Sequence, residues 1–206
     1  MENFIKKYNV SRETLAKLSR FADLLKVWQT KMNLVSNHSL AEIWTRHIAD
    51  SYQLYQYLNS DAKCVYDIGS GAGFPAIVLA IASEGDSRPT AFTLIESITK
   101  KTVYLNAVKN ELGLKNVQIL NARSENLGLP AADFITARAV ANLKKLFGFS
   151  YPLTNKNTVL IFPKGKTYEE ELADACQNWL FNVDVKKSEI DDEGVVLIIS
   201  NLRKKR

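Results

Sequence analysis

Asp67-Ile68-Gly69-Ser70-Gly71-Ala72-Gly73-Phe74-Pro75 is the stretch of sequence that decides the fold. It follows a short apolar run, 65–68, typical of a buried strand, and it leads into a helix-like segment, 74–83. In this setting glycines let the backbone turn sharply and approach a ligand closely. The G-x-G-x-G spacing differs from the G-x-G-x-x-G dinucleotide fingerprint, and the Gly-Lys-Ser/Thr of a P-loop is missing. The turn therefore predicts an α/β fold whose ligand is neither a dinucleotide nor the nucleoside triphosphate of a P-loop protein.

Strands and helices alternate along the rest of the chain, which predicts a parallel sheet covered on both faces. We expect strands at 65–68, 90–96, 117–121, 134–137 and 158–162, and helices at 74–83, 99–112, 143–151 and 168–180. Two further strands, 183–187 and 195–200, are joined only by the turn Asp191–Gly194. So short a connection requires an antiparallel pair. The expected fold class is α/β: a class I Rossmann-like methyltransferase fold, with a mostly parallel seven-stranded sheet and an antiparallel C-terminal hairpin.

The first sixty residues carry helical periodicity and are predicted to form an N-terminal helical extension. Ser11 is placed to cap one helix, and Ser39-Leu40-Ala41-Glu42 has the pattern of a capping box for another. The domain division predicted from this change of pattern is a helical extension at 1–60 and a ligand-binding domain at 61–206.

Composition excludes several classes of protein. The 206 residues are 46% hydrophobic and 24% charged, which is typical of a folded domain. Cys64 and Cys176 match no metal-ligand spacing, so we expect no metal site and no disulfide framework. Apolar runs are too short for a signal peptide or a membrane span, which predicts a cytoplasmic protein; we expect a monomer. The net charge of +5 and the basic tail Arg203–Arg206 mildly favour an anionic partner, although a solvated terminus is the better explanation of the tail taken alone.

Acidic residues at strand ends indicate how an adenosine-containing cofactor would be held. Glu96 ends the second strand, where a carboxylate can accept from both ribose hydroxyls. Asp67 is placed for the positively charged methionine end of S-adenosyl-L-methionine, and the carboxylate of Glu125 for the adenine amino group. Gly69, Gly71 and Gly73 would form the turn beneath the ligand. The alternative for Glu96 is a solvated charge at a strand end.

Several separate motifs resemble one family over nearly the whole chain. They are Asn33-Leu34-Val35-Ser36, Arg46-His47-Ile48-Ala49-Asp50-Ser51, Asp67 to Pro75, Arg138-Ala139-Val140-Ala141 and Pro163-Lys164-Gly165. In this order they are similar to the ribosomal RNA small-subunit methyltransferase G family, also called glucose-inhibited division protein B. Two positions depart from its pattern: Ala76 replaces the usual Gly, and Gln29 stands where Asn often follows the tryptophan.

The resemblance implies transfer of a methyl group from S-adenosyl-L-methionine to N7 of one guanine in 16S rRNA, with the rRNA or the small ribosomal subunit as partner. It also implies cofactor contacts at Gly69, Phe74, Ser124, Glu125 and Arg138. Guanine N7 carries a free lone pair and no proton, so the reaction needs no general base; the protein supplies orientation and excludes water.

Basic residues are the candidates for contact with the substrate. Lys164 and Arg123 are the predicted catalytic residues, and Arg46, His47 and Arg138 are further candidates. Three of them have a structural alternative: Lys164 as a loop lysine, His47 as a satisfied buried histidine, and Arg46 as the partner of Asp50 across one helix turn.

Two other functions compete with this one. A small-molecule methyltransferase would use the N-terminal helices as a lid over its pocket. A non-catalytic module would bind the cofactor and scaffold ribosome assembly without turnover.

Overall fold

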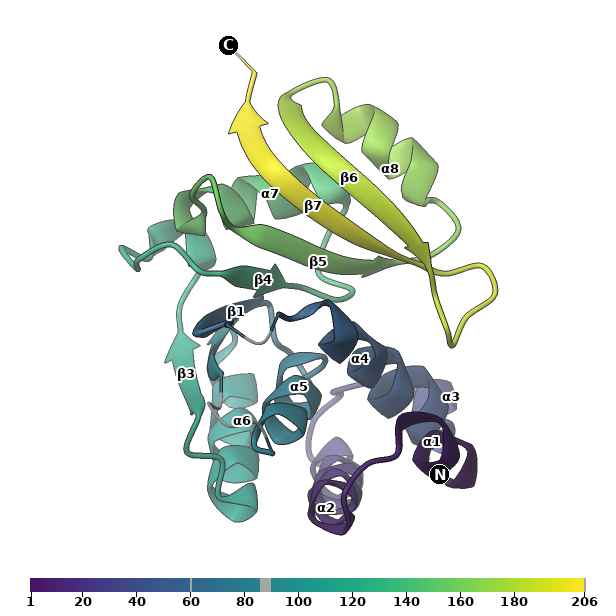
Figure 1. Ribbon diagram of the computed structural model, residues 1–206. Helices are drawn as coiled ribbons and strands as arrows, with labels where there is room; N and C mark the ends of the chain where they lie inside the picture. Colours follow the sequence, from purple (N-terminus) through teal and green to yellow (C-terminus); the bar gives the residue numbers. More distant parts are fainter. Residues whose placement is uncertain (60, 86–89, 206) are drawn as a thin grey trace.

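The computed structural model describes residues 1–59, 61–85 and 90–205, and it is built around one seven-stranded sheet. The strand order is β3-β2-β1-β4-β5-β7-β6 (Figure 1). The strands are β1 (Cys64–Ile68), β2 (Ala91–Glu96), β3 (Val117–Asn121), β4 (Phe134–Thr136), β5 (Val159–Lys164), β6 (Trp179–Lys187) and β7 (Val195–Lys204). The first five run parallel, whereas β7 is antiparallel to both β5 and β6. The predicted mostly parallel sheet with an antiparallel C-terminal hairpin is confirmed.

Helices cover the sheet on both faces. They are α1 (Glu2–Tyr8), α2 (Arg12–Gln29), α3 (Asn37–Ala41), the π-helix η1 (Trp44–Ala49), α4 (Asp50–Tyr52), α5 (Ala76–Ser83), α6 (Thr99–Leu112), α7 (Leu143–Ser150) and α8 (Tyr168–Ala175). Short 3₁₀ turns add η2 (Gln53–Tyr57), η3 (Ser124–Asn126) and η4 (Tyr151–Leu153). The predicted bounds of α6 are confirmed, because Gly113 ends the helix in the left-handed conformation that glycine adopts readily.

Two hydrophobic cores lie on opposite faces of the sheet (Figure 1). One packs α2, α5 and α6 against the sheet and includes Phe21, Ile77 and Leu105. The other is formed with α7 and includes Phe147 and Trp179. The N-terminal helices therefore share a core with the strand–helix units. The division at residue 60 stays a prediction, and Ser60 itself lies outside the described residues.

Helix starts in the N-terminal extension were predicted with mixed success. Ser11 caps α2 by accepting a hydrogen bond from the amide of Thr14 at 3.0 Å, as predicted. The predicted capping box at Ser39–Glu42 is wrong. Ser36 caps the short α3 instead, accepting from the amide of Ser39, whose own hydroxyl donates back to the Ser36 carbonyl. Two serines three residues apart offer the same cap, and the sequence pattern alone does not separate them.

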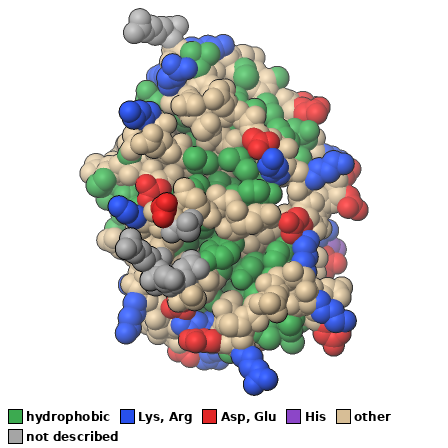
Figure 2. All heavy atoms as spheres, viewed as in Figure 1, with side chains coloured by type: hydrophobic (Ala, Val, Ile, Leu, Met, Phe, Trp, Pro, Cys, Tyr) green, Lys and Arg blue, Asp and Glu red, His purple; other side chains and the backbone are tan. Residues whose placement is uncertain are grey.

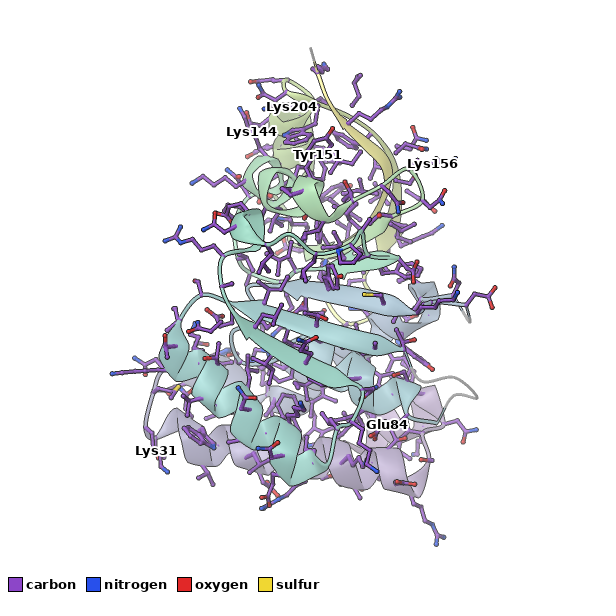
Figure 3. The ribbon with its side chains drawn as sticks, turned by 90° about the vertical axis from the view of Figure 1, so that its left-hand side faces the viewer. Lys31, Glu84, Lys144, Tyr151, Lys156 and Lys204 are labelled. Carbon is purple, nitrogen blue, oxygen red and sulfur yellow. The ribbon has the colours of Figure 1, made fainter. Side chains whose placement is uncertain are left out.

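The C-terminal region differs most from prediction. Helix α8 ends at Ala175, and Trp179 and Leu180 belong to β6 because they pair with Lys204 and Arg203 of β7. Arg203 and Lys204 of the basic tail are therefore part of β7, and Arg203, Lys204 and Lys205 are exposed, as the alternative of a solvated terminus expects; Arg206 lies outside the described residues. Burial of Trp179 against Phe147, with ring centroids 5.9 Å apart, holds this pairing in place. Figure 3 shows Lys204, Lys144 and Tyr151 at this end of the molecule.

Candidate functional site

The glycine-rich turn leaves β1 and enters α5 with its three glycines at positive φ. A Cβ added at Gly69 would lie 2.7 Å from Val140, and one at Gly73 would lie 2.8 Å from Ile77. At Gly71 the nearest atom to such a Cβ would be the Gly69 carbonyl oxygen, 3.6 Å away. Gly69 and Gly73 are thus required by close packing within the protein, whereas a Cβ at Gly71 would make only one ordinary van der Waals contact. Gly71 is the position at which a ligand can approach the backbone.

Asp67 is buried at the end of β1, directly before this turn, and is only 1% exposed. One carboxylate oxygen, Oδ1, accepts a hydrogen bond from the Thr136 hydroxyl at 2.7 Å. The other, Oδ2, is buried and has no hydrogen-bond partner among the described residues. Burial raises the pKa of Asp67 to about 7. An unpartnered carboxylate oxygen in such a place fits a ligand that brings a positive charge.

Glu96 holds the glycine-rich turn from the neighbouring strand. Its Oε2 accepts from the Gly71 amide at 2.9 Å, and its Oε1 accepts from the Ile98 amide at 2.8 Å. The residue is 5% exposed, so the alternative of a solvated strand-end charge is wrong. Carboxylate oxygens have several lone pairs, and these amide bonds leave capacity to accept ribose hydroxyls.

The segment after β3 places Arg123, Ser124 and Glu125 at the same edge of the sheet, since Asn121 is in register with Glu96. Ser124 is buried, and its hydroxyl donates to Glu125 at 3.1 Å, whereas Arg123 and Glu125 are exposed. Lys164 ends β5, four strand positions away from β3. At about 4.8 Å per strand, roughly 19 Å separates the two strands. The structure thus does not bring the two predicted catalytic residues, Arg123 and Lys164, together.

Arg138 joins the glycine-rich turn to the N-terminal extension. Its Nη1 donates to the Asp50 carboxylate and to the Arg46 carbonyl, both at 2.9 Å, and its Nη2 donates to Nδ1 of His47. The guanidinium carbon lies 5.1 Å from the centroid of the Phe74 ring. The predicted pairing of Arg46 with Asp50 is wrong: Arg46 binds Glu42 at 2.6 Å, and Asp50 binds Arg138. The π-helix η1 has i→i+5 hydrogen bonds, so residues four apart do not stack as in an α-helix.

His47 is buried between Arg138 and the turn, and its ring stacks on Phe74 with centroids 4.8 Å apart. Burial, reinforced by the neighbouring Arg138 charge, lowers the pKa of His47 to about 4. The neutral ring accepts from Arg138 at Nδ1, so its proton is at Nε2. Nε2 is buried and has no partner among the described residues. His47 is therefore buried, as the structural alternative expects, but only one of its two ring nitrogens has a hydrogen-bond partner among the described residues.

Lys164 is part of β5 and not of a loop, and its side chain is 9% exposed. The ammonium donates to Glu171 Oε2 at 2.7 Å and to the Ala141 carbonyl at 3.0 Å. The same Glu171 oxygen accepts from the amide of Leu143, at the start of α7, at 2.7 Å. The charge of Lys164 is thus balanced within the protein.

A cavity of about 1220 Å³ opens beside this cluster. It lies between the 39–50 segment, the 138–142 segment, the end of β5 and the loop that joins β6 to β7. Arg138, His47 and Lys164 line it, whereas the glycine-rich turn and Glu96 do not. Arg138 and His47 therefore separate two neighbouring regions: a ligand turn on one side and a large polar cavity on the other.

The sequence indicates the ligand turn and much of the cavity wall, but not the residues that pair with the cations of that wall. The sequence indicates Asp50 only as a partner of Arg46, and it does not single out Glu171 or Gln53. Asp50 stands within a quoted motif, but nothing in the sequence pattern indicated Glu171 or Gln53. Across residues 1–59, 61–85 and 90–205, no group of three or more His, Cys, Asp or Glu side chains could hold a metal ion. Within the same residues, no helix is long and apolar enough to span a membrane.

Comparison with known proteins shows which family the chain belongs to. The family model described as rRNA small subunit methyltransferase G matches residues 14–193. The chain is 38% identical over 201 residues to ribosomal RNA small subunit methyltransferase G of Cereibacter sphaeroides, covering 98% of this chain and 97% of that protein. It is 37% identical over 196 residues to the protein of the same name from Rickettsia bellii, covering 95% and 98%.

Solved structures of methyltransferases share the fold. An O-methyltransferase from Bacillus cereus superposes with a TM-score of 0.61 at 14% identity, covering 97% of this chain and 96% of that one. M. jannaschii TYW2, solved in complex with AdoMet, superposes with a TM-score of 0.59 at 17% identity, covering 85% and 80%. The fold is the class I methyltransferase fold.

Proposed function

The chain belongs to the rRNA small subunit methyltransferase G family, and on that premise we propose that it transfers a methyl group from S-adenosyl-L-methionine to N7 of one guanine in 16S rRNA. The observation that carries the proposal is the turn at Gly71, open to a ligand and next to Oδ2 of buried Asp67, which has no partner within residues 1–59, 61–85 and 90–205. We expect the enzyme to act as a cytoplasmic monomer on the rRNA or the small subunit.

The residues around the turn fit the cofactor. Asp67 would bind the methionine ammonium, Glu96 the ribose hydroxyls, and Ser124 with Glu125 the adenine. Gly69, Gly73 and Phe74 shape the turn, and Arg138 stands where the methionine end meets the cavity. S-adenosyl-L-methionine supplies an electrophilic methyl group when it is bound.

The cavity suits a guanine that has left its stack. N7 is nucleophilic without deprotonation, so a general base is not needed, in keeping with a neutral His47 and a paired Lys164. The protein has to orient the base and exclude water. Arg138, His47 and Lys164 carry hydrogen-bond donors, which suit the O6 acceptor beside N7 and the phosphates. Of the two predicted catalytic residues, we retain Lys164 on this side and assign Arg123 to the adenosine end.

One experiment separates this function from its rivals. Small-subunit rRNA from cells that lack the protein is incubated with labelled S-adenosyl-L-methionine, as naked transcript and as assembled particles. We expect close to one methyl group per rRNA, and strand cleavage by reduction and aniline at a single guanine. Cofactor binding without transfer to either form would support a scaffold, and transfer only to small molecules would support the lid model.

A further inference from the structure

The loop between β6 and β7, residues 188–194, forms one wall of the cavity. Hydrogen bonds within the loop determine part of its conformation. The Ser188 hydroxyl accepts from the amides of Ile190 and Asp191, each at 3.1 Å, and Gly194 donates to the Asp191 carbonyl at 2.9 Å. These bonds shape the loop, but they do not attach it to the opposite side of the cavity.

Gln53 makes that attachment from the N-terminal extension, and it is buried, with 1% of its surface exposed. Its Oε1 accepts from the Glu189 amide at 2.8 Å. Its Nε2 donates to the Ser188 hydroxyl at 3.2 Å and to Oδ1 of Asp50 at 2.9 Å. One amide side chain thus joins segments 135 residues apart in the sequence.

Asp50 continues the connection, because its second oxygen, Oδ2, accepts from Arg138 at 2.9 Å. A row of hydrogen bonds therefore runs from Arg138 through Asp50 and Gln53 to the loop. Burial raises the pKa of Asp50 while Arg138 opposes that shift, as expected for a carboxylate enclosed with its partner. Buried networks of this kind fix geometry when every member is satisfied.

A second set of contacts holds the same loop from outside. Glu189 binds the ammonium of Lys7 at 2.9 Å, the hydroxyl of Tyr8 at 2.9 Å and the Gln56 amide at 2.9 Å. The Lys7 and Glu189 side chains are 42% and 30% exposed. Exposed pairs contribute little to stability, so the buried contact of Gln53 should dominate.

We propose that Gln53 is a positioning residue for the methyl acceptor. Through its hydrogen bonds it fixes loop 188–194, one wall of the cavity, in a constant position relative to Arg138. This inference rests on the proposed function, which identifies the methyl acceptor as RNA. The cofactor turn does not depend on this loop, because Asp67, Gly71 and Glu96 are held by contacts within the sheet domain. Arg138, the cofactor residue next to this row, has its own bonds to Asp50, His47 and the Arg46 carbonyl, none of which involves Gln53. Replacing Gln53 should therefore affect acceptor binding much more than cofactor binding.

The test compares Gln53→Met with Gln56→Met, which keep side-chain volume while removing hydrogen bonds to the same loop. Losing the buried bonds in Gln53→Met should raise KM for rRNA about tenfold. Its kcat and its Kd for the cofactor should stay within about twofold of the values of the unmodified chain, which is much smaller than the expected change in KM. Hydrogen exchange at the amides of Glu189, Ile190 and Asp191 should accelerate in Gln53→Met and remain unchanged in Gln56→Met.

An unchanged KM in folded Gln53→Met, or an equal loss of cofactor affinity, would overturn the proposal. Should Gln53→Met fail to fold, Ser188→Ala removes the hydroxyl at the loop end of the same contact, and the same KM increase is expected. Absence of any RNA methylation by the unmodified chain would contradict the proposed function instead. Unchanged exchange at the three loop amides would contradict the role of Gln53 in either case.

Discussion

The glycine-rich turn and the neighbouring cavity differ in how their charged groups are engaged. Beside the turn, Asp67 keeps one carboxylate oxygen without a partner among the described residues. Around the cavity, Arg46, Arg138 and Lys164 are each paired with a carboxylate of the protein. The turn is ready to receive a cation, whereas under the proposed function the cavity would meet an anionic RNA with cations whose charge is already balanced. RNA must exchange partners with these ion pairs, or bind through other basic residues.

One face of the molecule carries charges of both signs. Figure 2 shows basic and acidic side chains interspersed over one face, and they are not gathered into one basic patch. The excess of +5 is thus not concentrated on that face. Shape and positioning within the cavity should therefore contribute to RNA recognition along with charge.

The largest expected effect is at Gly71, and its absence would contradict the assignment of the turn to the cofactor. Gly71→Val places a branched side chain where the ligand approaches, so affinity for S-adenosyl-L-methionine should fall about a hundredfold or more by calorimetry. Gly113→Val is the matched control, because Gly113 has φ of +66° and no atom within 4 Å of an added Cβ. It should show similar backbone strain with full cofactor affinity. Unchanged affinity in folded Gly71→Val would remove the turn from the cofactor site.

Lys164 tests the cavity side of the comparison. Lys164→Ala should reduce methyl transfer about thirtyfold, equivalent to roughly 2 kcal/mol, while cofactor affinity is retained. Glu171→Gln sharpens the test, because it frees the Lys164 charge and should strengthen RNA binding. If both variants instead lose stability equally and bind RNA normally, the ion pair is only structural.

The two regions also differ in how far their residues could be predicted from the sequence. The turn, Asp67 and Glu96 are local to strand ends, where the chain itself brings them together. Glu171 and Asp50 line the cavity, and Gln53 connects its walls, through contacts between distant segments, which a single sequence does not encode in any local pattern. The same holds for the tail: Lys204 extends β7 because Trp179 lies opposite it, and helical periodicity at 168–180 gave no sign of that pairing.

Glu96 should show an intermediate effect on the turn. Glu96→Ala removes the acceptor for ribose and for the Gly71 and Ile98 amides, so cofactor affinity should fall about tenfold. Glu96→Gln keeps one acceptor oxygen and should lose less. A decrease under about twofold in Glu96→Ala, measured by calorimetry, would contradict the ribose assignment.

Asp67 should make cofactor binding at the turn depend on pH. Its pKa is raised to about 7, so the ionised form that binds a cation increases between pH 5.5 and 7.5. Cofactor affinity should rise several-fold over that range, and Asp67→Asn should abolish the rise. Because the folded pKa exceeds the unfolded value, the ligand-free chain should also lose stability as pH rises through 7. His47, with its pKa at about 4, remains neutral throughout this range. A pH-independent affinity in the unmodified chain would contradict the Asp67 assignment.

The most direct measurement of the difference between the two regions is the salt dependence of both ligands on the same protein. Neutralising RNA phosphates releases condensed counterions, so log affinity for rRNA should fall linearly with log salt, with a slope set by the number of contacts. Affinity for S-adenosyl-L-methionine, held at the turn by short-range contacts, should change little over the same range. RNA affinity that is indifferent to salt, or cofactor affinity that falls as steeply as RNA affinity, would contradict the assignment of the cavity side to RNA and of the turn to the cofactor.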